Sequence, residues 1–358
     1  MKQLGPGLAV ALFAIIFAAL SLAARGWDAR AFALIGPRFE QGDPAARKGY
    51  DGQFAYYIAT DPIGAARKMD AAAYRYLRIV YPALGWLLSL GGQAALAPWA
   101  LIGINVAALG ALAALLGELL AGLGASRWYG ALVPLTAGML FALRADLNEP
   151  LALALALGSV VLLNQRRTAW ATLLLALSAL TKETGYVYAG GIVLYLLASR
   201  RARAAFGVAL GSLGPSAVWG ALVGAWLGQS PFATERTAFE FVPFSGLRFT
   251  EPLAAQLILI VWIVIPSIAL GLWLLRDVLR GERGLFMFLL AANVLFVAFL
   301  PRASYIDAFA VMRLAAGMMA AALLWLAATN RRRGLKFLAA LWAPSGLLLL
   351  ILPGVLVG

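Results

Sequence analysis

Long apolar runs alternate with short polar segments along almost the whole chain, and this pattern predicts an all-helical polytopic membrane protein. Eleven runs are interpreted as transmembrane helices, at about 7–24, 98–121, 128–143, 150–164, 168–181, 185–198, 206–227, 252–275, 284–300, 308–328 and 337–354. No repeat with a period of 20–50 residues stands out, and no second soluble domain is visible between the runs. The pattern therefore predicts one continuous membrane domain.

Three segments allow alternative topologies. The run at 7–24 has the short basic start of a signal peptide, but many runs follow it, so a retained first helix is favoured. Segment 79–91 spans about 20 Å as a helix, short of a hydrocarbon core of about 30 Å, and is expected to be only partly immersed. The stretch 168–198 is either one long tilted helix or a hairpin that turns at Lys182 and Glu183. The hairpin is favoured because it keeps all later basic clusters on one side.

Basic residues recur after every second apolar run. The clusters are Arg166-Arg167; Arg200, Arg201 and Arg203; Arg276, Arg280 and Arg283; and Arg331, Arg332, Arg333 and Lys336. Because Lys and Arg collect on the cytoplasmic side, these clusters and the N-terminus are predicted to be cytoplasmic, in the plasma membrane. The outer face then carries segments 25–78, 144–149, 182–184, 228–251 and 301–307. The first outer segment is too long for a passive connection and is expected to contain amphipathic helices.

Composition agrees with this class and narrows the chemistry. The chain is 63% hydrophobic and 13% charged, with a mean hydropathy of +0.86, whereas a soluble domain is usually about 45–50% apolar and about 25% charged. These values exclude an ordinary soluble domain, a disordered chain and a nucleic-acid-binding domain. The net charge of +13 is attributed to membrane orientation. With no Cys and no His in the sequence, acid–base chemistry must come from Asp, Glu, Lys or Tyr.

The densest polar motif lies in the first outer segment, from Gly49 to Pro62. Asp51 stands directly before a run with apolar residues at helical spacing, which suits a helix lying at the membrane surface. Gly49 and Gly52 flank this carboxylate and allow a ligand to approach the backbone closely. The structural alternative is that Asp51 is a helix N-cap and that the neighbouring aromatic residues are interface anchors.

Two further pairs of charged residues are candidates for chemistry at the outer face. Asp146 and Glu149 share one helix face if their turn is helical, where they would position an acceptor or a divalent cation; alternatively they only precede a helix. Lys182 and Glu183 interrupt a long apolar stretch, where charge is costly. They mark either a polar site or a self-neutralising structural pair.

Four segments of the first 200 residues resemble, in order, loop motifs of integral-membrane glycosyltransferases. Tyr-Asp-Gly-Gln-Phe at 50–54, followed by Tyr-Tyr-Ile-Ala-Thr-Asp-Pro at 56–62, resembles the first-loop signature of a bacterial family assigned to cell-surface glycopolymer formation. It is also similar to the signature of GPI-mannosyltransferase-type enzymes, and both resemble the GT-C superfamily. Segments 74–82, 144–150 and 180–184 resemble further elements of such proteins, whereas Ala55 and Thr60 depart from the usual pattern. Residues 1–205 are thus interpreted as a GT-C-like module and 206–358 as variable helices.

The resemblance implies a glycosyltransferase that moves a sugar from a polyprenyl-phosphate-linked donor to a cell-envelope glycan or lipid acceptor at the outer face. An inverting transfer needs a carboxylate to take the proton of the acceptor hydroxyl, and Asp51 is the first candidate. Asp28 is the competing candidate, although it also fits an interface cluster beside Trp27. A divalent cation is the one cofactor kept open. The candidate substrate-binding residues, cations for the phosphate among them, are Tyr50, Gln53, Tyr57, Arg75, Arg78, Asp146, Glu149, Lys182, Glu183 and Arg302.

A polytopic transporter or lipid flippase without transferase activity is the alternative from another class, and a non-catalytic assembly partner is a third. A transporter places polar residues near the middle of the membrane, often in broken helices. In this sequence the acids gather in the predicted outer segments instead. Arg313 is an exception, since it lies inside an apolar run and needs a polar partner, for which Asp307 is close enough.

Overall fold

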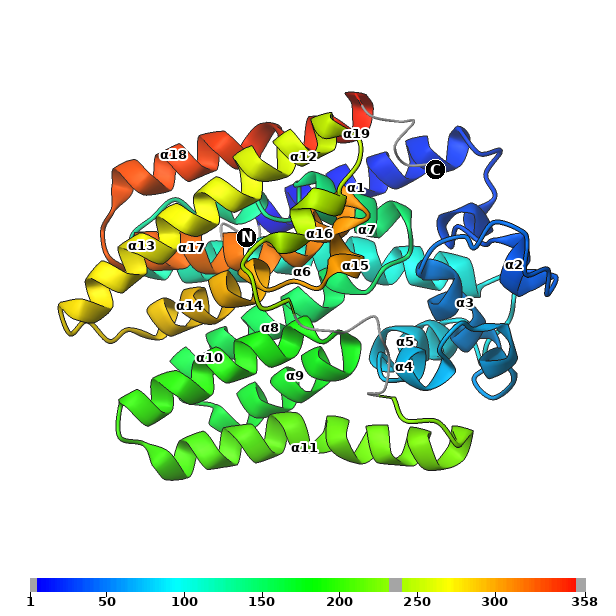
Figure 1. The fold of residues 1–358 in the computed structure, drawn as a ribbon, viewed down its shortest axis with the longest axis horizontal. Coiled ribbons are helices and arrows are strands. Elements are labelled where there is room, and N and C mark those ends of the chain that lie inside the picture. Colours follow the sequence, from blue (N-terminus) through cyan, green and yellow to red (C-terminus); the bar gives the residue numbers. More distant parts are fainter. Residues whose placement is uncertain (1–4, 232–239, 352–358) are drawn as a thin grey trace.

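A computed structural model describes residues 5–231 and 240–351 of the chain, and every regular element in these two ranges is a helix (Figure 1). Part of the outer segment 228–251 and the end of the last apolar run lie outside the described residues. The helices are α1 Gly5–Ala23, α2 Pro37–Glu40, α3 Gly52–Thr60, α4 Ala72–Tyr76, α5 Val80–Leu88, α6 Ala97–Gly122, α7 Ala137–Arg144, α8 Glu149–Asn164, α9 Thr168–Thr181, α10 Thr184–Ala198, α11 Ala202–Leu227, α12 Leu253–Leu259, α13 Ile265–Leu279, α14 Leu285–Ala298, α15 Arg302–Tyr305, α16 Ala308–Leu314, α17 Ala316–Ala328, α18 Arg332–Trp342 and α19 Leu348–Ile351. The predicted all-α class is confirmed.

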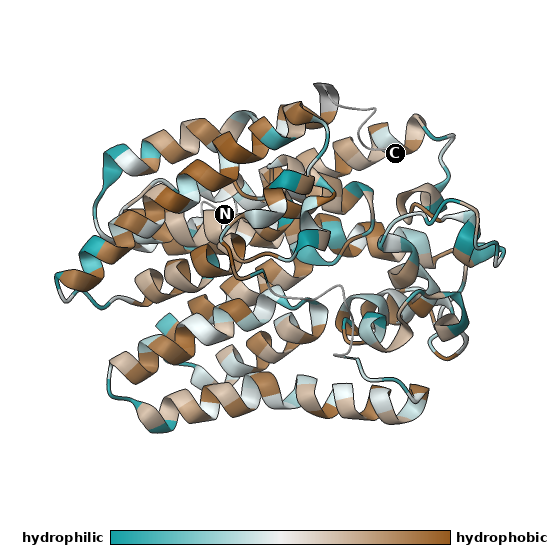
Figure 2. Ribbon diagram, viewed as in Figure 1, coloured by the Kyte–Doolittle hydropathy of each residue, from teal (hydrophilic) through white to brown (hydrophobic). Residues whose placement is uncertain are grey.

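Five helical segments are long and apolar enough to cross a membrane: 5–23, 97–122, 202–227, 253–279 and 308–328. The segment at 253–279 joins α12 to α13 through a π-helical turn, and 308–328 joins α16 to α17. Apolar residues cover the helices along their length, while polar residues gather at the helix ends and in α2–α5 (Figure 2). On α1 and α11, large apolar side chains such as Leu8, Leu20, Phe206 and Leu222 face outward, as expected of surfaces in contact with lipid.

The centre of the bundle is α17, whose side chains are almost all buried, including Leu323, Leu324 and Trp325. The helices around it pack closely where small residues meet. A Cβ atom added at Gly7 of α1 would lie 2.9 Å from the Cβ of Ala114 in α6, and one at Gly130 would lie 2.5 Å from the carbonyl oxygen of Ala113. Small residues at these contacts let the helix backbones approach each other, which is the usual basis of helix association in membranes.

The run at 128–143, predicted as one helix, is instead a 3₁₀ turn over Arg127–Ala131 followed by α7. Pro134 separates the two, because proline lacks a backbone N–H and disfavours the helical conformation in the residue before it. Residues 130–145 nevertheless run back alongside α6. They begin with Gly130 against Ala113 and end with Ala145 against Gly52, beside α3.

Two segments decided the predicted topology, 168–198 and 79–91. Residues 168–198 form two helices, α9 and α10, that turn at Lys182 and Glu183 and pack against each other, so the hairpin is confirmed. Segment 79–91 contains α5, a helix of nine residues that ends before Gly91 and Gly92. Both glycines have a positive φ, which is the conformation that favours glycine at the end of a helix.

The bundle has two chemically different ends (Figure 1). At one end, which we term the basic end, Arg331 forms an ion pair with Asp277 at 2.6 Å, Arg332 donates to the carbonyl of Leu123, and Arg283 donates to the carbonyl of the last α10 residue. At the opposite end, α2–α5 form a compact layer over residues 25–96, which we term the first-loop end. The basic clusters of the second half of the chain therefore lie far from the first loop.

Candidate functional site

Asp51 lies at the first-loop end between two arginine side chains that follow it in the same loop. Its Oδ2 atom is 3.1 Å from Nη1 of Arg75 and 3.8 Å from Nη1 of Arg78. Both arginines are largely buried, but the Asp51 side chain keeps 37% of its surface exposed. A carboxylate held between fixed cations and still open to solvent is accessible to a ligand.

Each arginine is fixed by a second carboxylate and an aromatic ring. Arg75 donates to both oxygens of Asp70, at 3.0 and 3.1 Å, and stacks over the ring of Phe54. Arg78 binds Glu183 from the α9–α10 turn through Nε at 3.0 Å and Nη2 at 2.8 Å. It also donates to the hydroxyl of Tyr74 and lies over that ring, 4.6 Å from its centroid. Such two-point contacts hold a guanidinium in one orientation.

The electrostatics of this cluster keep its acids ionised. Burial favours the neutral form of Asp51, but Arg75 and Arg78 outweigh burial and lower the pKa of its carboxyl. Burial also opposes ionisation of Glu183, yet Arg78 and Lys182 bring its pKa down to about 2. Burial raises the pKa of Tyr74 to about 12, so its hydroxyl stays protonated. At neutral pH the cluster therefore consists of carboxylates, guanidinium groups and a neutral phenol.

A second charged cluster lies deeper, where α8, the α9–α10 turn and α16 meet. Glu149, the first residue of α8, places Oε1 2.9 Å from Nζ of Lys182 and 2.8 Å from Nε of Arg313. Arg313 also donates to the Tyr50 hydroxyl at 2.8 Å, and that hydroxyl donates to Asp307. The ion-pair partner of Arg313 is thus Glu149, not the expected Asp307, which it reaches only through Tyr50. Tyr50 stands between Arg313 and Asp307 because the Asp307 side chain caps α16, where it accepts from the backbone N–H of Phe309.

Asp146 differs from the acids of the two clusters because no side chain in the described ranges pairs with its carboxylate. Its side chain is fully buried, and neither carboxylate oxygen accepts a hydrogen bond within the described ranges. Burial raises the pKa of this carboxyl well above its usual value. The residue has φ of +48°, so the turn before α8 is not helical and the expected shared face with Glu149 does not form. Asp adopts this left-handed conformation more readily than most residues, and here it closes the turn that follows α7.

Asp51, Arg75, Arg78, Asp146 and Lys182 line one small cavity of about 30 Å³. This volume is enough for about two water molecules. The walls are completed by apolar residues of α3 and α5 and by the turn before α8: Phe54, Ala55, Ile58, Tyr81, Pro82, Leu147 and Asn148. Segments 50–54, 74–82, 144–150 and 180–184, which are far apart in the sequence, thus meet at one place.

Local packing explains how the loop holds Asp51 in position. Gly49 has φ of +73° and pairs with Ile35 in an isolated β-bridge, while the N–H of Tyr50 donates to the carbonyl of Leu34. A Cβ at Gly52 would lie 2.0 Å from the carbonyl oxygen of Ala145. The close approach that the two glycines permit is therefore made to the chain itself and not to a ligand. It fastens the start of α3 to the turn that carries Asp146.

The structure distinguishes the two candidate bases. The Asp51 side chain makes no capping hydrogen bond, although it precedes α3, so the N-cap interpretation does not describe it. Asp28 is the residue that caps: its Oδ1 accepts from the backbone N–H of Arg30 at 2.9 Å, at the start of the 3₁₀ turn Ala29–Phe32. Asp28 lies on the wall of a separate pocket that it shares with Tyr50.

Three other predicted site residues lie outside the charged clusters. Gln53 is buried on another side of α3, where it accepts from Gly36 N–H at 3.2 Å and donates to the Lys48 carbonyl at 2.8 Å, bracing the loop. Tyr57 is buried in the first-loop core with no hydrogen bond to its hydroxyl within the described ranges. Arg302 is exposed and stacks on Phe249 at 3.8 Å from the ring centroid.

Sequence reasoning did not place Asp70, Tyr74, Asp307 and Arg313 at the site. Tyr74 stands within a quoted motif, and its position one helical turn before Arg78 was an available signal. For Arg313 the sequence shows only a charge inside an apolar run, with Asp307 as the nearest acid. With regard to metals, no group of three or more acidic side chains suited to hold an ion occurs among residues 5–231 and 240–351.

Comparisons with protein-family models, curated proteins and solved structures give no match for this chain. The site is therefore interpreted from its geometry and from the sequence resemblance alone.

Proposed function

We propose that this protein is a GT-C-type membrane glycosyltransferase that transfers a sugar from a polyprenyl-phosphate-linked donor to a cell-envelope glycan or lipid acceptor. The observation that carries the proposal is the convergence of four loop motifs on one cavity. A partly exposed carboxylate, Asp51, and three cations, Arg75, Arg78 and Lys182, line that cavity together. Transfer from a phosphate-linked donor needs these two kinds of group: a base for the acceptor and cations for the departing phosphate.

In the proposed reaction, Asp51 takes the proton from the acceptor hydroxyl, whose oxygen attacks the anomeric carbon of the donor. The bond from that carbon to the phosphate oxygen breaks, and the polyprenyl phosphate leaves with the electron pair. Arg75 and Arg78 stabilise the charge that develops on it. A phosphate that binds these arginines competes with Asp51 for them. The pKa of Asp51, which the arginines lower in the free protein, then rises, and the carboxylate becomes a stronger base.

A surface suited to the prenyl tail lies next to the cavity. Tyr81 and Pro82, near the start of α5, line the cavity beside Asp51. Farther along the same helix and its C-terminal turn, Trp86, Leu87, Leu88 and Leu90 are exposed. An exposed apolar strip of this kind on a helix too short to cross a bilayer is expected at the lipid interface. A donor would place its tail along this strip and its phosphate toward Arg75 and Arg78.

The proposal includes a complete topology. Eleven runs cross the plasma membrane, the N-terminus and the basic end are cytoplasmic, and the first-loop end, with the site, faces outward. The arrangement of charge supports this: the basic end collects arginines near the buried acid Asp277, and the first-loop end holds most of the acids. Lipid-linked sugars presented at the outer face would reach the cavity from the bilayer.

A transporter or flippase fits the arrangement less well. Its polar residues would line the middle of the bundle. Here the two charged clusters lie where helices begin or end: Asp51 precedes α3, Glu149 begins α8, and Lys182 and Glu183 form a turn. Arg313 is only six residues into the apolar segment 308–328 and points to the same clusters.

The test is a transfer assay with the purified full-length protein. The protein is incubated with a panel of polyprenyl-phosphate sugars, and consumption of each donor and release of polyprenyl phosphate are followed by mass spectrometry. Asp51→Asn should abolish consumption while the variant still expresses and folds. Asp43→Asn, an exposed acid elsewhere in the same loop, should retain full activity. Full activity of Asp51→Asn would remove Asp51 from the mechanism, and consumption of no donor by the wild-type protein would refute the transferase.

A further inference from the structure

A second, larger pocket lies at the first-loop end on the other side of the Tyr50–Asp51 peptide. It has a volume of about 430 Å³, which is typical of a small-molecule site. Its walls carry three arginines, two acids, a tyrosine and apolar side chains: Arg25, Asp28, Arg30, Ala31, Leu34, Ile35, Glu40, Arg47, Gly49 and Tyr50. We term it the arginine pocket. Tyr50 borders this pocket, whereas Asp51, the next residue, borders the small cavity.

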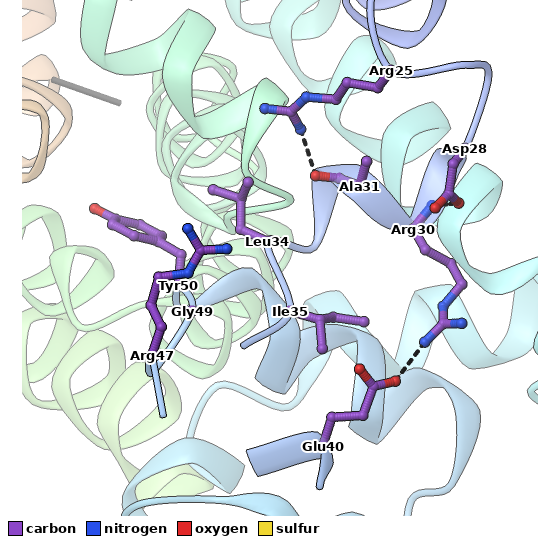
Figure 3. Close-up of a pocket in the computed structure, with 10 residues that line it drawn as sticks. All are labelled: Arg25, Asp28, Arg30, Ala31, Leu34, Ile35, Glu40, Arg47, Gly49 and Tyr50. Atoms are coloured by element: carbon purple, nitrogen blue, oxygen red, sulfur yellow. Dashed lines mark hydrogen bonds and ion pairs between the residues drawn. The ribbon is translucent and has the colours of Figure 1, made fainter. Parts of the chain in front are cut away.

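The acids of the arginine pocket are already engaged. Glu40 accepts from Arg30 at 2.7 Å, and Asp28 accepts from the backbone N–H of Arg30. Figure 3 shows these three side chains on one side of the pocket, whereas the Arg47 guanidinium lies on the opposite side beside Leu34 and Tyr50, and the Arg25 guanidinium points to Ala31. The engaged acids thus leave one side of the pocket with positive charge only.

That positive charge has no carboxylate counter-ion within ion-pair distance in the described part of the chain. Arg25 donates to the carbonyl of Ala31 at 2.5 Å, and neither Arg25 nor Arg47 forms a salt bridge with an acid among residues 5–231 and 240–351. Burial lowers the pKa of Arg25, the nearby charge of Arg144 lowers it further, and Asp146, which makes no ion pair with it in the described ranges, opposes both effects. Arginine nevertheless remains protonated in proteins. Two guanidinium groups on one wall, with no carboxylate at ion-pair distance from them in the described ranges, are suited to an anion, above all to phosphate oxygens.

The position of the pocket indicates which anion reaches it. Arg25 follows α1 by two residues, and α1 exposes apolar side chains to its surroundings along its length. Trp27, two residues after Arg25, is also exposed, as is usual for a residue anchored at the boundary between lipid and water. The arginine pocket therefore opens at the level of lipid headgroups.

We propose that the arginine pocket binds the phosphate-bearing headgroup of a lipid-linked acceptor, with Arg25 and Arg47 holding the phosphate. The inference rests on the proposed function and specifies its acceptor as an anionic lipid. Donor and acceptor then approach from opposite sides of the Tyr50–Asp51 peptide, the donor phosphate at Arg75 and Arg78 and the acceptor phosphate in the arginine pocket.

The test measures binding and not transfer. Full-length protein in phosphatidylcholine nanodiscs is titrated with dioctanoyl phosphatidic acid, and binding is followed by the thermal shift of the protein. Arg25→Gln and Arg47→Gln should each weaken binding by about tenfold, the usual effect of losing one charge-assisted hydrogen bond. Arg67→Gln, an exposed arginine of the same loop outside the pocket, should change binding by less than twofold. Arg47 is exposed, so its variant is expected to fold even if Arg25→Gln does not.

Three outcomes would overturn the proposal: unchanged binding in both pocket variants, equal weakening in all three variants, and inorganic phosphate binding as tightly as phosphatidic acid. The last result would show an anion site without preference for a lipid. Asp51→Asn should bind phosphatidic acid like the wild type, because Asp51 borders the other cavity. Normal binding by a protein that transfers no sugar would therefore refute the transferase and retain the lipid site.

Discussion

The buried ion pairs of Glu149 provide a demanding test of the charged clusters. Only 2% of the Glu149 side chain is exposed, and its partners Lys182 and Arg313 are each 7% exposed. Glu149→Gln would leave both cations buried without their carboxylate. Removing one partner of a buried pair usually costs about 3–5 kcal/mol, because the remaining charge stays desolvated and uncompensated. At about 2 °C per kcal/mol for a large chain, the apparent melting temperature should fall by about 6–10 °C.

The surface pair Arg30–Glu40 is the matched control, since its contact of 2.7 Å is as short but its side chains are 49% and 40% exposed. Arg30→Gln should cost about 1 kcal/mol or less and lower the melting temperature by about 2 °C at most. Both variants are compared with the wild type by thermal unfolding in detergent at low and high salt. High salt should reduce only the effect of Arg30→Gln, because water and ions do not reach the Glu149 cluster. Equal losses in the two variants would refute the assignment of Glu149 as a buried counter-ion.

Three further predictions test the neighbouring parts of the site. Gly52→Ala should markedly reduce the yield of folded protein, because its Cβ would lie 2.0 Å from a carbonyl oxygen. Gly103→Ala should leave the yield unchanged, because its Cβ would meet nothing within 4 Å. Equal yields of the two variants on size-exclusion chromatography would contradict this. Asp146 has a pKa raised above its unfolded value of 3.8, so its ionisation lowers stability as the pH rises, and the wild type should melt at a higher temperature at pH 5 than at pH 7. Asp146→Asn should lose that difference. An unchanged pH profile in the variant would show that the carboxyl is not buried alone. Glu183 has its pKa lowered from 4.5 to about 2, so its carboxylate stabilises the fold above pH 4.5 and loses this effect as the pH falls through 2. Glu183→Gln should therefore melt at a lower temperature than the wild type at pH 7, with a loss of stability of about 1 kcal/mol for this partly exposed group. The difference in melting temperature should disappear toward pH 2.

Helix positions were predictable from the sequence because, in a membrane protein, a continuous apolar run indicates a helix that satisfies its own backbone hydrogen bonds. The turn at Lys182 and Glu183 was also predictable, since a charged pair inside an apolar stretch is stable only at a turn or in a polar site. The break at Pro134 is not visible in the hydropathy of the run at 128–143, which is apolar on both sides of the proline; only the backbone effect of proline signals it. The grouping of 1–205 and 206–358 stays a prediction.

Partner choice within the site was not predictable. Arg78 pairs with Glu183, a residue 105 positions away, and Arg313 pairs with Glu149 instead of Asp307. Such choices depend on how the helices pack, and spacing along the chain carries no information about them. The difference between Asp51 and Asp28 is similar, because each precedes a helical turn and only the backbone conformation decides which side chain caps it.

The proposal that Asp51 faces the non-cytoplasmic side is tested most directly by thiol labelling. The sequence contains no cysteine, so single-cysteine variants report one position each. Ala45→Cys lies exposed in the first loop and Glu282→Cys lies exposed at the basic end. In intact spheroplasts, a membrane-impermeant maleimide should modify Ala45→Cys at once and Glu282→Cys only after lysis. Labelling of Glu282→Cys in intact spheroplasts, with Ala45→Cys protected until lysis, would place the site on the cytoplasmic side and contradict the account.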